Sequence, residues 1–583
     1  MTNKWTDRFL PPKGFERISF LVLAALLLAL KVLAIQHFRS DSDETQHAHV
    51  VWGWVTGQVQ YRDYFDNHMP LFQLLCAPVM ALLGERADII ILLRWVLLPL
   101  YFVNLWCVFR LTEILYSRRV APWSALLAGI LARFFYTSTE FRTDQLWTAF
   151  WLLSLVVGVS GVFTTRRALG MGLLLGLSGA VSVKSVPLVV SLGAAAAIAT
   201  AFGLWRGERM GLGAALARLV ALIAGMVIPS AVVILAFARA GLFWIMYYCV
   251  IAHNLVPGLK RWGRFSLHQW YFPLGVPLMA LYGWLIFRQS PNARQAFRRA
   301  LILLTPWLYV FLLLSYWPDI TREDDLPYVP LVPLSLIPLA LLAGNLVKSE
   351  KCRARWLTYG LPALSLFELC VTWHTHDIRE DRMRVTTHNI ADVLKLTGPR
   401  DYVMDDKGDY VYRTRAYYWV LEPMTKARVR KGMIHDNIPQ RMIEKGVKLC
   451  SMQCGRTGTR ASEFIAANYM PFDTQTRDMG VLGKIIGRDA AGGDYHFDVA
   501  IPQTYAVVTE SGSIAGTLDG KPYTGPLWLA AGRHEFARAG GGGRVAIFLN
   551  DAREKGFSPL FEVDDQLVKV LTTASSDKPE EDQ

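Results

Sequence analysis

The stretch "SDSDETQHAHVVWGWVTGQVQYRDYFDNHMPLF", residues 40–72, decides how the rest of the 583-residue chain is interpreted. It follows a long apolar run and gathers acids, histidines and aromatic residues where that run ends. The segments "DETQHAHVVWGWVTGQ" and "PLFQLLCAPVMALLG" have apolar residues at helical spacing, which predicts two amphipathic helices in a membrane interface. We therefore expect a large first loop, residues 37–88, that holds carboxylates at the depth of a lipid headgroup.

The first 373 residues have the composition of a polytopic membrane protein. The chain is 52% hydrophobic, and apolar runs of about 17 to 25 residues recur, as a hydrocarbon core about 30 Å thick requires. About eleven such runs occur, at 17–36, 89–115, 121–138, 145–163, 168–184, 187–204, 212–238, 270–287, 300–317, 327–346 and 356–373. The sequence thus predicts an α-helical transmembrane domain over residues 1–373.

The distribution of charge predicts the orientation of this domain. Basic residues occur at the N-terminus and at every second connection, whereas acids dominate the other connections. Because cytoplasmic flanks of spanning helices collect Lys and Arg, the N-terminus is predicted to be cytoplasmic. The loop 37–88 and residues 374–583 then lie on the exported, periplasmic side of a bacterial inner membrane. The net charge of +13 follows from this topology, so no nucleic-acid partner is inferred from it.

The sequence changes to a soluble composition after residue 373. Mixed alternation and helix-like patches predict an exported α/β domain over 374–500. Short alternating segments between Gly-rich turns predict a β-rich, sandwich-like domain over 501–563, and the polar tail 564–583 is predicted to be disordered. We recognise no catalytic constellation in this exported region.

The acids of the first loop have two interpretations. Ser42 or Asp43 fits a helix N-cap, with further acids in the first turn, and caps are common. Alternatively, Asp43 is a functional carboxylate. A second acid, Asp144, opens the fourth predicted span, where a bare charge is costly unless it is used or paired.

Cations occur near the same exported ends, although the orientation rule does not require them there. Arg94, Arg133 and Lys184 lie within predicted spans near their exported ends, Arg142 sits beside Asp144, and Arg322 follows later in the chain. Together with His68 they are predicted to ring one face. Each alone fits a structural ion pair or a snorkelling side chain. Together they suit an anionic lipid substrate, because Lys and Arg hold a phosphate while a nearby carboxylate acts as a base.

The order of these features resembles that of the GT-C glycosyltransferases, specifically the protein O-mannosyltransferase and lipid A aminoarabinose transferase group. The resemblance covers about residues 15–345 and is carried by Asp43-Glu44, by "GQVQYRDYFDNHMPLF", by Asp144 and by "GLLLGLSGAVSVKSVPL". It implies a GT-C fold, a polyprenyl-phosphate sugar as donor, and a catalytic first-loop acid at Asp43 with Glu44 beside it. The family's second-loop acid falls on Asp144. Its phosphate-contacting positions fall on His68, Lys184, Arg322 and Tyr328.

The predicted function is an inverting transfer of a sugar from this lipid donor to an acceptor on the exported side. Asp43 would take the acceptor's proton, and Lys184, helped by His68 and Arg322, would stabilise the departing phosphate. The acceptor is a lipid, a glycan or a protein, and membrane lipids are expected partners. No cofactor is required, and a divalent metal stays an open alternative. The sugar and acceptor are expected to contact Tyr61, Arg62, Arg142 and His253.

Two other classes of function fit part of the sequence. A transporter or flippase for polyprenyl lipids or small molecules would also carry embedded charges, but we find no internal repeat of the kind common in secondary transporters. An assembly or scaffold protein would act through residues 374–583. For the loop aromatics, including Tyr61, a role as interfacial anchors competes with a role in sugar binding.

Overall fold

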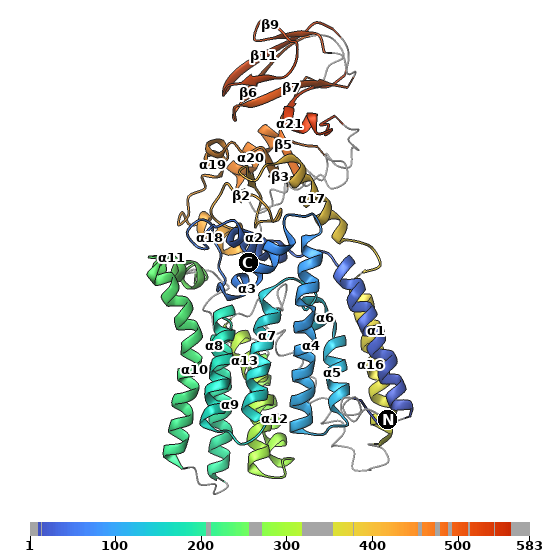
Figure 1. Ribbon diagram of the computed structural model, residues 1–583, viewed down its shortest axis with the longest axis vertical. Coiled ribbons are helices and arrows are strands. Elements are labelled where there is room, and N and C mark those ends of the chain that lie inside the picture. The colour runs from blue at the N-terminus through green and yellow to red at the C-terminus, as the bar shows by residue number, and fades with distance from the viewer. Residues whose placement is uncertain are drawn as a thin grey trace.

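The computed structural model describes residues 10–12, 14–205, 211–255, 271–316, 354–376, 378–452, 458–472, 479–487, 493–510, 514–540 and 543–560. A helical bundle is formed by the first part of the chain, and a region containing β-sheets is stacked on one end of it (Figure 1). Arg322, Tyr328 and the predicted span 327–346 lie outside the described residues.

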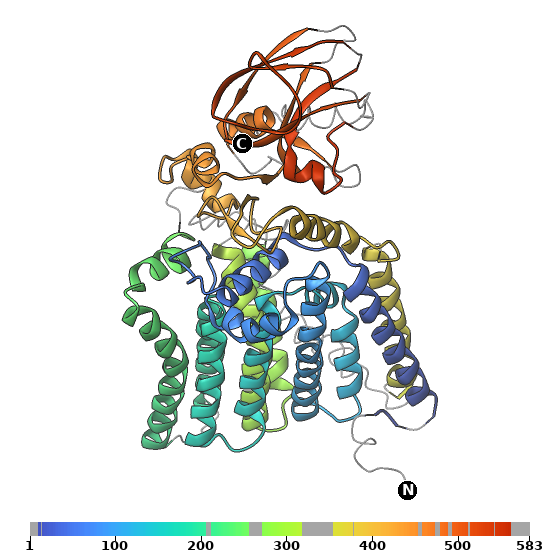
Figure 2. The same ribbon diagram turned by 45° about the horizontal axis from the view of Figure 1, so that its top comes forward.

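The bundle contains four described helices that are long and apolar enough to cross a membrane: α1 (Phe15–His37), α4 (Ile89–Leu115), α9 (Ser185–Trp205) and α10 (Leu212–Arg239). Further helices run beside them (Figure 2): α5 (Ala121–Ile130), α6 (Ala132–Thr137), α7 (Thr143–Val159), α8 (Thr165–Val181), α12 (Tyr271–Arg288), α13 (Ala293–Tyr316) and α16 (Leu361–Thr375). These helices coincide with predicted apolar runs. The count of eleven spans is not confirmed, because in the described part of the chain only four helices are both long enough and apolar enough to span a membrane.

Small residues let two of the helices approach closely. A Cβ atom added at Gly172 or Gly176 of α8 would overlap the backbone of α10. Close backbone contact of this kind is typical of helices that pack in a lipid environment, where van der Waals contact replaces the hydrophobic effect.

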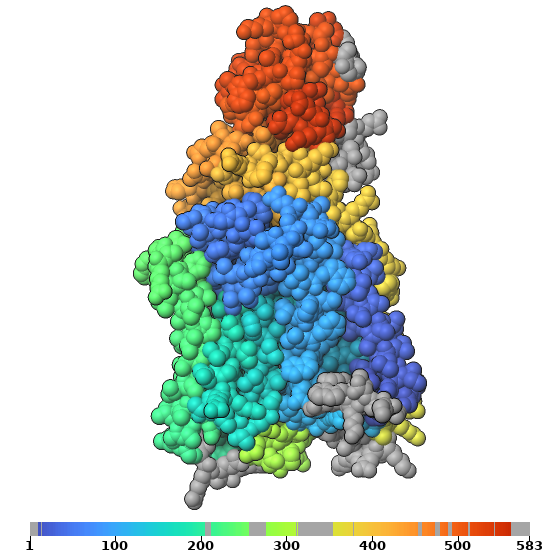
Figure 3. Space-filling view, viewed as in Figure 1, coloured from blue at the N-terminus to red at the C-terminus, as the bar shows by residue number. Residues whose placement is uncertain are grey.

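The first loop forms two helices, as predicted, α2 (Ser42–Val55) and α3 (Leu71–Leu83). They lie at the end of the bundle that faces the sheet-containing region (Figures 1 and 3). Residues 44–53 of α2 are all buried, so α2 does not have the exposed polar face of an interfacial helix. The reason is that α2 packs against α3 and the bundle in one apolar core and against the C-terminal region at His49.

The C-terminal region combines short helices with two sheets. Its helices are α17 (Met383–Leu396), α18 (Pro423–Arg430), α19 (Ile438–Lys445), α20 (Thr459–Asn468) and α21 (Asn550–Glu554). Its strands are β1 (Tyr402–Met404), β2 (Thr414–Arg415), β3 (Leu449–Ser451), β4 (Tyr469–Pro471), β5 (Met479–Gly487), β6 (Asp494–Val499), β7 (Gln503–Thr509), β8 (Gly516–Leu518), β9 (Lys521–Pro522), β10 (Leu527–Leu529), β11 (Gly532–Arg538) and β12 (Val545–Leu549).

Eight of these strands form one mixed sheet in the order β10-β7-β12-β5-β3-β1-β2, with β4 also paired to β5. The pairs of β1 with β2 and with β3 are parallel, whereas the other pairs in the sheet are antiparallel. The antiparallel second sheet has the order β6-β11-β8-β9. Strands from both sides of residue 500 join the larger sheet. The division into domains at that residue stays a prediction.

A tight turn docks the C-terminal region on α2. In the turn 405–409, Gly408 has φ +95°, and a Cβ atom there would lie 2.6 Å from Cβ of His49. His49 in turn has Nδ1 2.8 Å from the carbonyl oxygen of Val411. Val411 and Tyr412 share a buried apolar core with the bundle. The turn that follows β1 is therefore held directly against the first loop.

Candidate active site

The N-terminus of α2 is capped by Asp41, not by Ser42 or Asp43 as one interpretation of the sequence expected. Oδ1 of Asp41 accepts a hydrogen bond of 2.9 Å from the backbone N–H of Asp43. The Glu44 carboxylate reaches back to the backbone N–H of Asp41, which completes a capping box. The side chain of Asp43 is therefore not used for capping.

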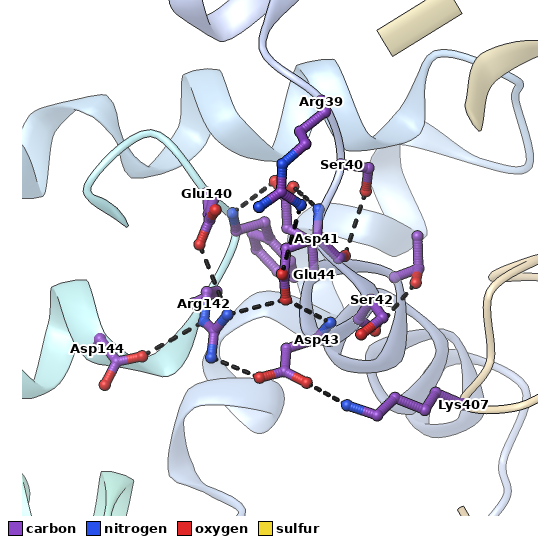
Figure 4. Close-up of polar contacts among 12 residues, drawn as sticks. Arg39, Ser40, Asp41, Ser42, Asp43, Glu44, Glu140, Arg142, Asp144 and Lys407 are labelled. Atoms are coloured by element: carbon purple, nitrogen blue, oxygen red, sulfur yellow. Dashed lines mark hydrogen bonds and ion pairs between the residues drawn. The ribbon is translucent and has the colours of Figure 1, made fainter. Parts of the chain in front are cut away.

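Instead, Asp43 lies between two cations (Figure 4). Nη2 of Arg142 donates to Oδ2 of Asp43 at 2.5 Å, and Nζ of Lys407 donates to Oδ1 at 2.6 Å. Burial alone would raise the pKa of Asp43, but the Arg142 and Lys407 charges outweigh it and hold that pKa well below its ordinary value. Asp43 is thus a carboxylate with each oxygen bound to a cation.

Arg142 joins several carboxylates. Besides Asp43, its guanidinium lies 2.9 Å from Asp41, 3.6 Å from Glu140 and 3.5 Å from Asp144. Glu140 is buried among acids, and burial is the main cause that raises its pKa to about 8. The Arg142 side chain, only 6% exposed, is fixed by these partners.

The loop that carries Arg142 is held by a buried lysine in α1. Nζ of Lys31 donates to the carbonyl oxygen of Phe135 at 2.7 Å and to the hydroxyls of Ser138 and Thr139 at 2.9 and 2.8 Å. These acceptors close the C-terminal end of α6. Lys31 thus fixes the chain just before Glu140 and Arg142.

Lys184 extends the ion pairs toward the next helices. Its Nζ lies 3.1 Å from Oδ1 of Asp144 and 5.8 Å from the centre of the Trp147 ring. Lys184 is 32% exposed, more than Arg142 or Lys407. The side chains Lys407, Asp43, Arg142, Asp144 and Lys184 therefore form one continuous row of alternating charge, which we call the charge row.

Glu44 has a different environment from its neighbour Asp43. Its carboxylate makes a bidentate pair with Arg94, with both bonds 2.6 Å long, and both side chains are fully buried. It also accepts the backbone N–H of Phe141 at 2.7 Å. Arg94 additionally donates to carbonyl oxygens at the end of α1. Glu44 therefore fastens α2 to α1 and α4.

Two histidines flank the charge row. His47 follows Asp43 by one helical turn, and its ring lies 4.5 Å from that of His68. Burial is the main cause that lowers the pKa of His47 well below its ordinary value, so His47 is neutral at pH 7. His68 is oriented by the buried carboxylate of Asp66, whose Oδ1 is 2.8 Å from its Nδ1.

Three predicted site residues lie apart from the charge row. The hydroxyl of Tyr61, which is fully buried, donates to the carbonyl oxygen of His68 at 2.6 Å. Arg62 is largely exposed and pairs with Asp63. His253 lies 3.2 Å from Glu422 and stacks on Trp419. Tyr61 thus supports the first loop at His68, whereas Arg62 and His253 pair with Asp63 and Glu422, which lie outside the charge row.

Sequence reasoning missed His47, Asp66 and Lys407. The spacing of four residues between Asp43 and His47 on a predicted helix was a usable signal. Asp66 lies two residues before His68, but nothing in the pattern marks it as that residue's partner. Lys407 has no local signal, because it reaches Asp43 only through the docking of the C-terminal region.

Chemically, the charge row offers a carboxylate kept deprotonated beside cations that suit a phosphate. Asp43 can accept a proton once one of its oxygens is released, and Lys184 is the cation most open to a ligand. Among the described residues, no group of three or more His, Cys, Asp and Glu side chains is placed to hold a metal ion.

The fold is similar to that of ArnT, a protein of the group that the sequence resemblance named. The chain is similar to ArnT from Cupriavidus metallidurans bound to undecaprenyl phosphate, with a TM-score of 0.51, 11% identity, and coverage of 79% of this chain and 97% of that one. The apo form of ArnT has a TM-score of 0.49 with the same identity and coverage. The apo oligosaccharyltransferase of Archaeoglobus fulgidus has a TM-score of 0.43 and 10% identity, over 84% of this chain and 74% of that one. No protein-family model and no curated protein sequence matches the chain.

Proposed function

We propose that the protein is an inverting membrane glycosyltransferase that uses a polyprenyl-phosphate sugar on the exported side of a bacterial inner membrane. The observation that carries this proposal is Asp43. Its carboxylate is free of capping and lies in the charge row with Lys184. The likeness in fold to a protein bound to undecaprenyl phosphate supports the choice of donor.

In the proposed reaction, the acceptor's hydroxyl or amine attacks the anomeric carbon of the sugar. The bond from that carbon to the phosphate oxygen breaks, and its electron pair leaves with polyprenyl phosphate. The acceptor's proton passes to Asp43. Lys184 and Arg142 stabilise the negative charge that develops on the departing phosphate. His68, oriented by Asp66, is a further contact for the phosphate when it is protonated.

This mechanism requires the donor phosphate to compete for cations that already have carboxylate partners. Lys184 meets this requirement best, because it is the most exposed cation of the charge row. Arg142 is fixed by several acids, so its part is to hold the row in place while it adds charge.

The test compares envelope glycans and lipid-linked sugars, by mass, in cells with and without the protein. A transferase predicts a glycosylated acceptor that is lost without the protein, together with accumulation of the intact polyprenyl-phosphate sugar. With the purified protein in vesicles, release of polyprenyl phosphate should equal the sugar transferred. A flippase instead predicts that intact donor changes leaflet and no polyprenyl phosphate is released, which would refute the proposal.

A further inference from the structure

The C-terminal region places a lysine directly on the carboxylate of Asp43. The Lys407 side chain is only 10% exposed, and its Nζ lies 2.6 Å from Oδ1 of Asp43. This contact joins two parts of the chain that are 364 positions apart. The position of the Lys407 side chain over Asp43 is set by the turn that carries Lys407.

The turn 405–409 is built to hold its shape. Asp405 accepts the backbone N–H of Gly408 at 2.8 Å and is itself paired with Arg415 at 2.7 Å, with both side chains buried. Asp409 accepts the backbone N–H groups of Asp406 and Lys407. These bonds, with the close approach of Gly408 to α2, fix the position from which Lys407 extends.

The two oxygens of Asp43 are not equally replaceable. Arg142 holds Oδ2, and it cannot leave without breaking its contacts with Asp41, Glu140 and Asp144. Lys407 holds Oδ1 through a flexible side chain. An acceptor that gives its proton to Asp43 therefore reaches Oδ1 more easily than Oδ2, and its O–H or N–H would take the place of the ammonium.

We propose that Lys407 is a positioning residue of the active site, supplied by the C-terminal region. It keeps Asp43 deprotonated, holds the carboxylate in position, and leaves Oδ1 when the acceptor binds there. This inference rests on the proposed function, because it assigns Lys407 to the same carboxylate. It makes the C-terminal region a necessary part of the site.

The expected consequence is a change in pH dependence. Asp43 is influenced by Arg142, Lys407 and His47, and through Arg142 by Asp41, Glu140 and Asp144. Lys184 and His68 lie around His47. Removing Lys407 takes away one of the two nearest cations, and an opposite charge at this distance lowers an acid's pKa by about 1 to 3 units. The acid limb of the rate profile should therefore move to higher pH.

The first measurement is the release of polyprenyl phosphate between about pH 2 and 8, because the wild-type acid limb lies below the ordinary range of an aspartate. Envelope fractions from cells that lack the protein supply donor and acceptor, and the added protein is wild type or a variant whose folding is checked at each pH. With Lys407→Ala, the acid limb should move up by about one pH unit or more. Lys407→Arg should restore the wild-type limb. Lys448→Ala, which removes a lysine paired with Asp551 in the same region, should leave it unmoved.

The second measurement is a double-mutant cycle of melting temperature at pH 7 with Asp43→Asn and Lys407→Ala. The two shifts should not add, because each substitution removes the same ion pair. Additive shifts, or an unmoved acid limb in an active Lys407→Ala protein, would overturn the inference. If the wild type releases no polyprenyl phosphate while the shifts stay non-additive, the proposed function fails and the contact between Lys407 and Asp43 stands.

Discussion

Nζ of Lys407 lies 2.6 Å from Oδ1 of Asp43, although one residue belongs to the C-terminal region and the other to the first loop. The bundle alone therefore does not contain the complete candidate site. The charge row starts in a turn after β1 and ends at Lys184, between α8 and α9. A chain shortened to its helical part would lose one of the two cations that hold Asp43.

Glu44→Gln should destabilise the protein strongly, although Asp43, its neighbour in sequence, is the candidate base. The substitution leaves the Arg94 guanidinium buried without its carboxylate partner. Breaking a buried pair of this kind typically costs about 3 to 5 kcal/mol. Thermal unfolding in detergent measures the loss. Asp88→Asn, which breaks the exposed pair with Arg86, serves as the control and should change stability by less than about 1 kcal/mol.

The buried pair of Glu44 and Arg94 also predicts that a second substitution restores part of the lost stability. Replacing both Glu44 and Arg94 with methionine removes both buried charges, and replacement of a buried pair by apolar residues is often close to neutral. The double variant should therefore have a higher melting temperature than Glu44→Gln. A Glu44→Gln protein as stable as the wild type would show that the pair does not fasten α2.

Glu140→Gln should stabilise the protein in alkaline solution. The pKa of Glu140 is raised to about 8, chiefly by burial, whereas an unfolded Glu titrates near pH 4.3. The favourable contribution of the protonated carboxyl is therefore complete below about pH 4.3 and is lost as the pH rises through 8. Glutamine mimics the protonated form at every pH.

Melting temperatures of the wild type and Glu140→Gln between pH 4.5 and 9 check this prediction. The melting temperature of the variant should exceed that of the wild type by an amount that grows as the pH rises and is largest above pH 8. The exposed Glu444, paired with Arg441, provides the control substitution Glu444→Gln, for which no such advantage is expected. A constant difference across the pH range would mean that Glu140 is ionised in the folded protein.

Lys184→Ala should weaken the binding of polyprenyl phosphate more than it weakens folding. Lys184 is about one-third exposed, and its partner Asp144 still pairs with Arg142 in the variant. Loss of the ion pair between Lys184 and Asp144 should therefore change the stability only modestly. A hydrogen bond to a charged group is worth about 1.5 to 3 kcal/mol, which corresponds to an affinity loss of roughly tenfold to a hundredfold. Binding of polyprenyl phosphate to purified protein provides the measurement. Unchanged affinity would assign Lys184 a structural role only.

The predicted orientation places the first loop and the C-terminal region on the exported side. Two exposed positions at opposite ends of the bundle test this in a cysteine-free variant. Arg62→Cys in the first loop should react with a membrane-impermeant thiol reagent in intact cells. Val162→Cys, between α7 and α8, should react only after the membrane is opened. The reverse pattern would invert the topology.

Local patterns in the sequence predicted much of the fold. Apolar runs and helical spacing depend on neighbours in the chain, and they predicted the long helices together with α2 and α3. Asp43, Asp144 and Lys184 were predicted as a group because each was placed near the exported membrane surface, and the structure joins them through Arg142.

Other features depend on how distant segments pack. The capping residue was misplaced because "DSDE" offers adjacent candidates, and Glu44 decides the choice by reaching back three residues to Asp41. That signal was present in the sequence. Lys407 offered none, since the strand order that carries its turn to α2 depends on contacts between distant segments.

The capping geometry makes Asp43→Asn a decisive test of the candidate base. Asn and Asp cap helices about equally well, and in any case Asp41 performs the capping. Asn cannot accept a proton at neutral pH, and general-base assistance is typically worth about 10² to 10⁴-fold in rate. We therefore expect Asp43→Asn to insert into the membrane and bind donor lipid while it transfers sugar at least roughly a hundredfold more slowly.

Asp41→Asn is the matched control, because it changes a neighbouring acid that also contacts Arg142. It should keep the cap and most of the turnover, since Arg142 retains Asp43, Glu140 and Asp144 as partners. Transfer rates of both purified, reconstituted variants, together with donor binding, separate the two acids. Near-normal turnover by Asp43→Asn would refute its role as base. Because Glu44 is locked on Arg94, the assignment would then pass to Asp144.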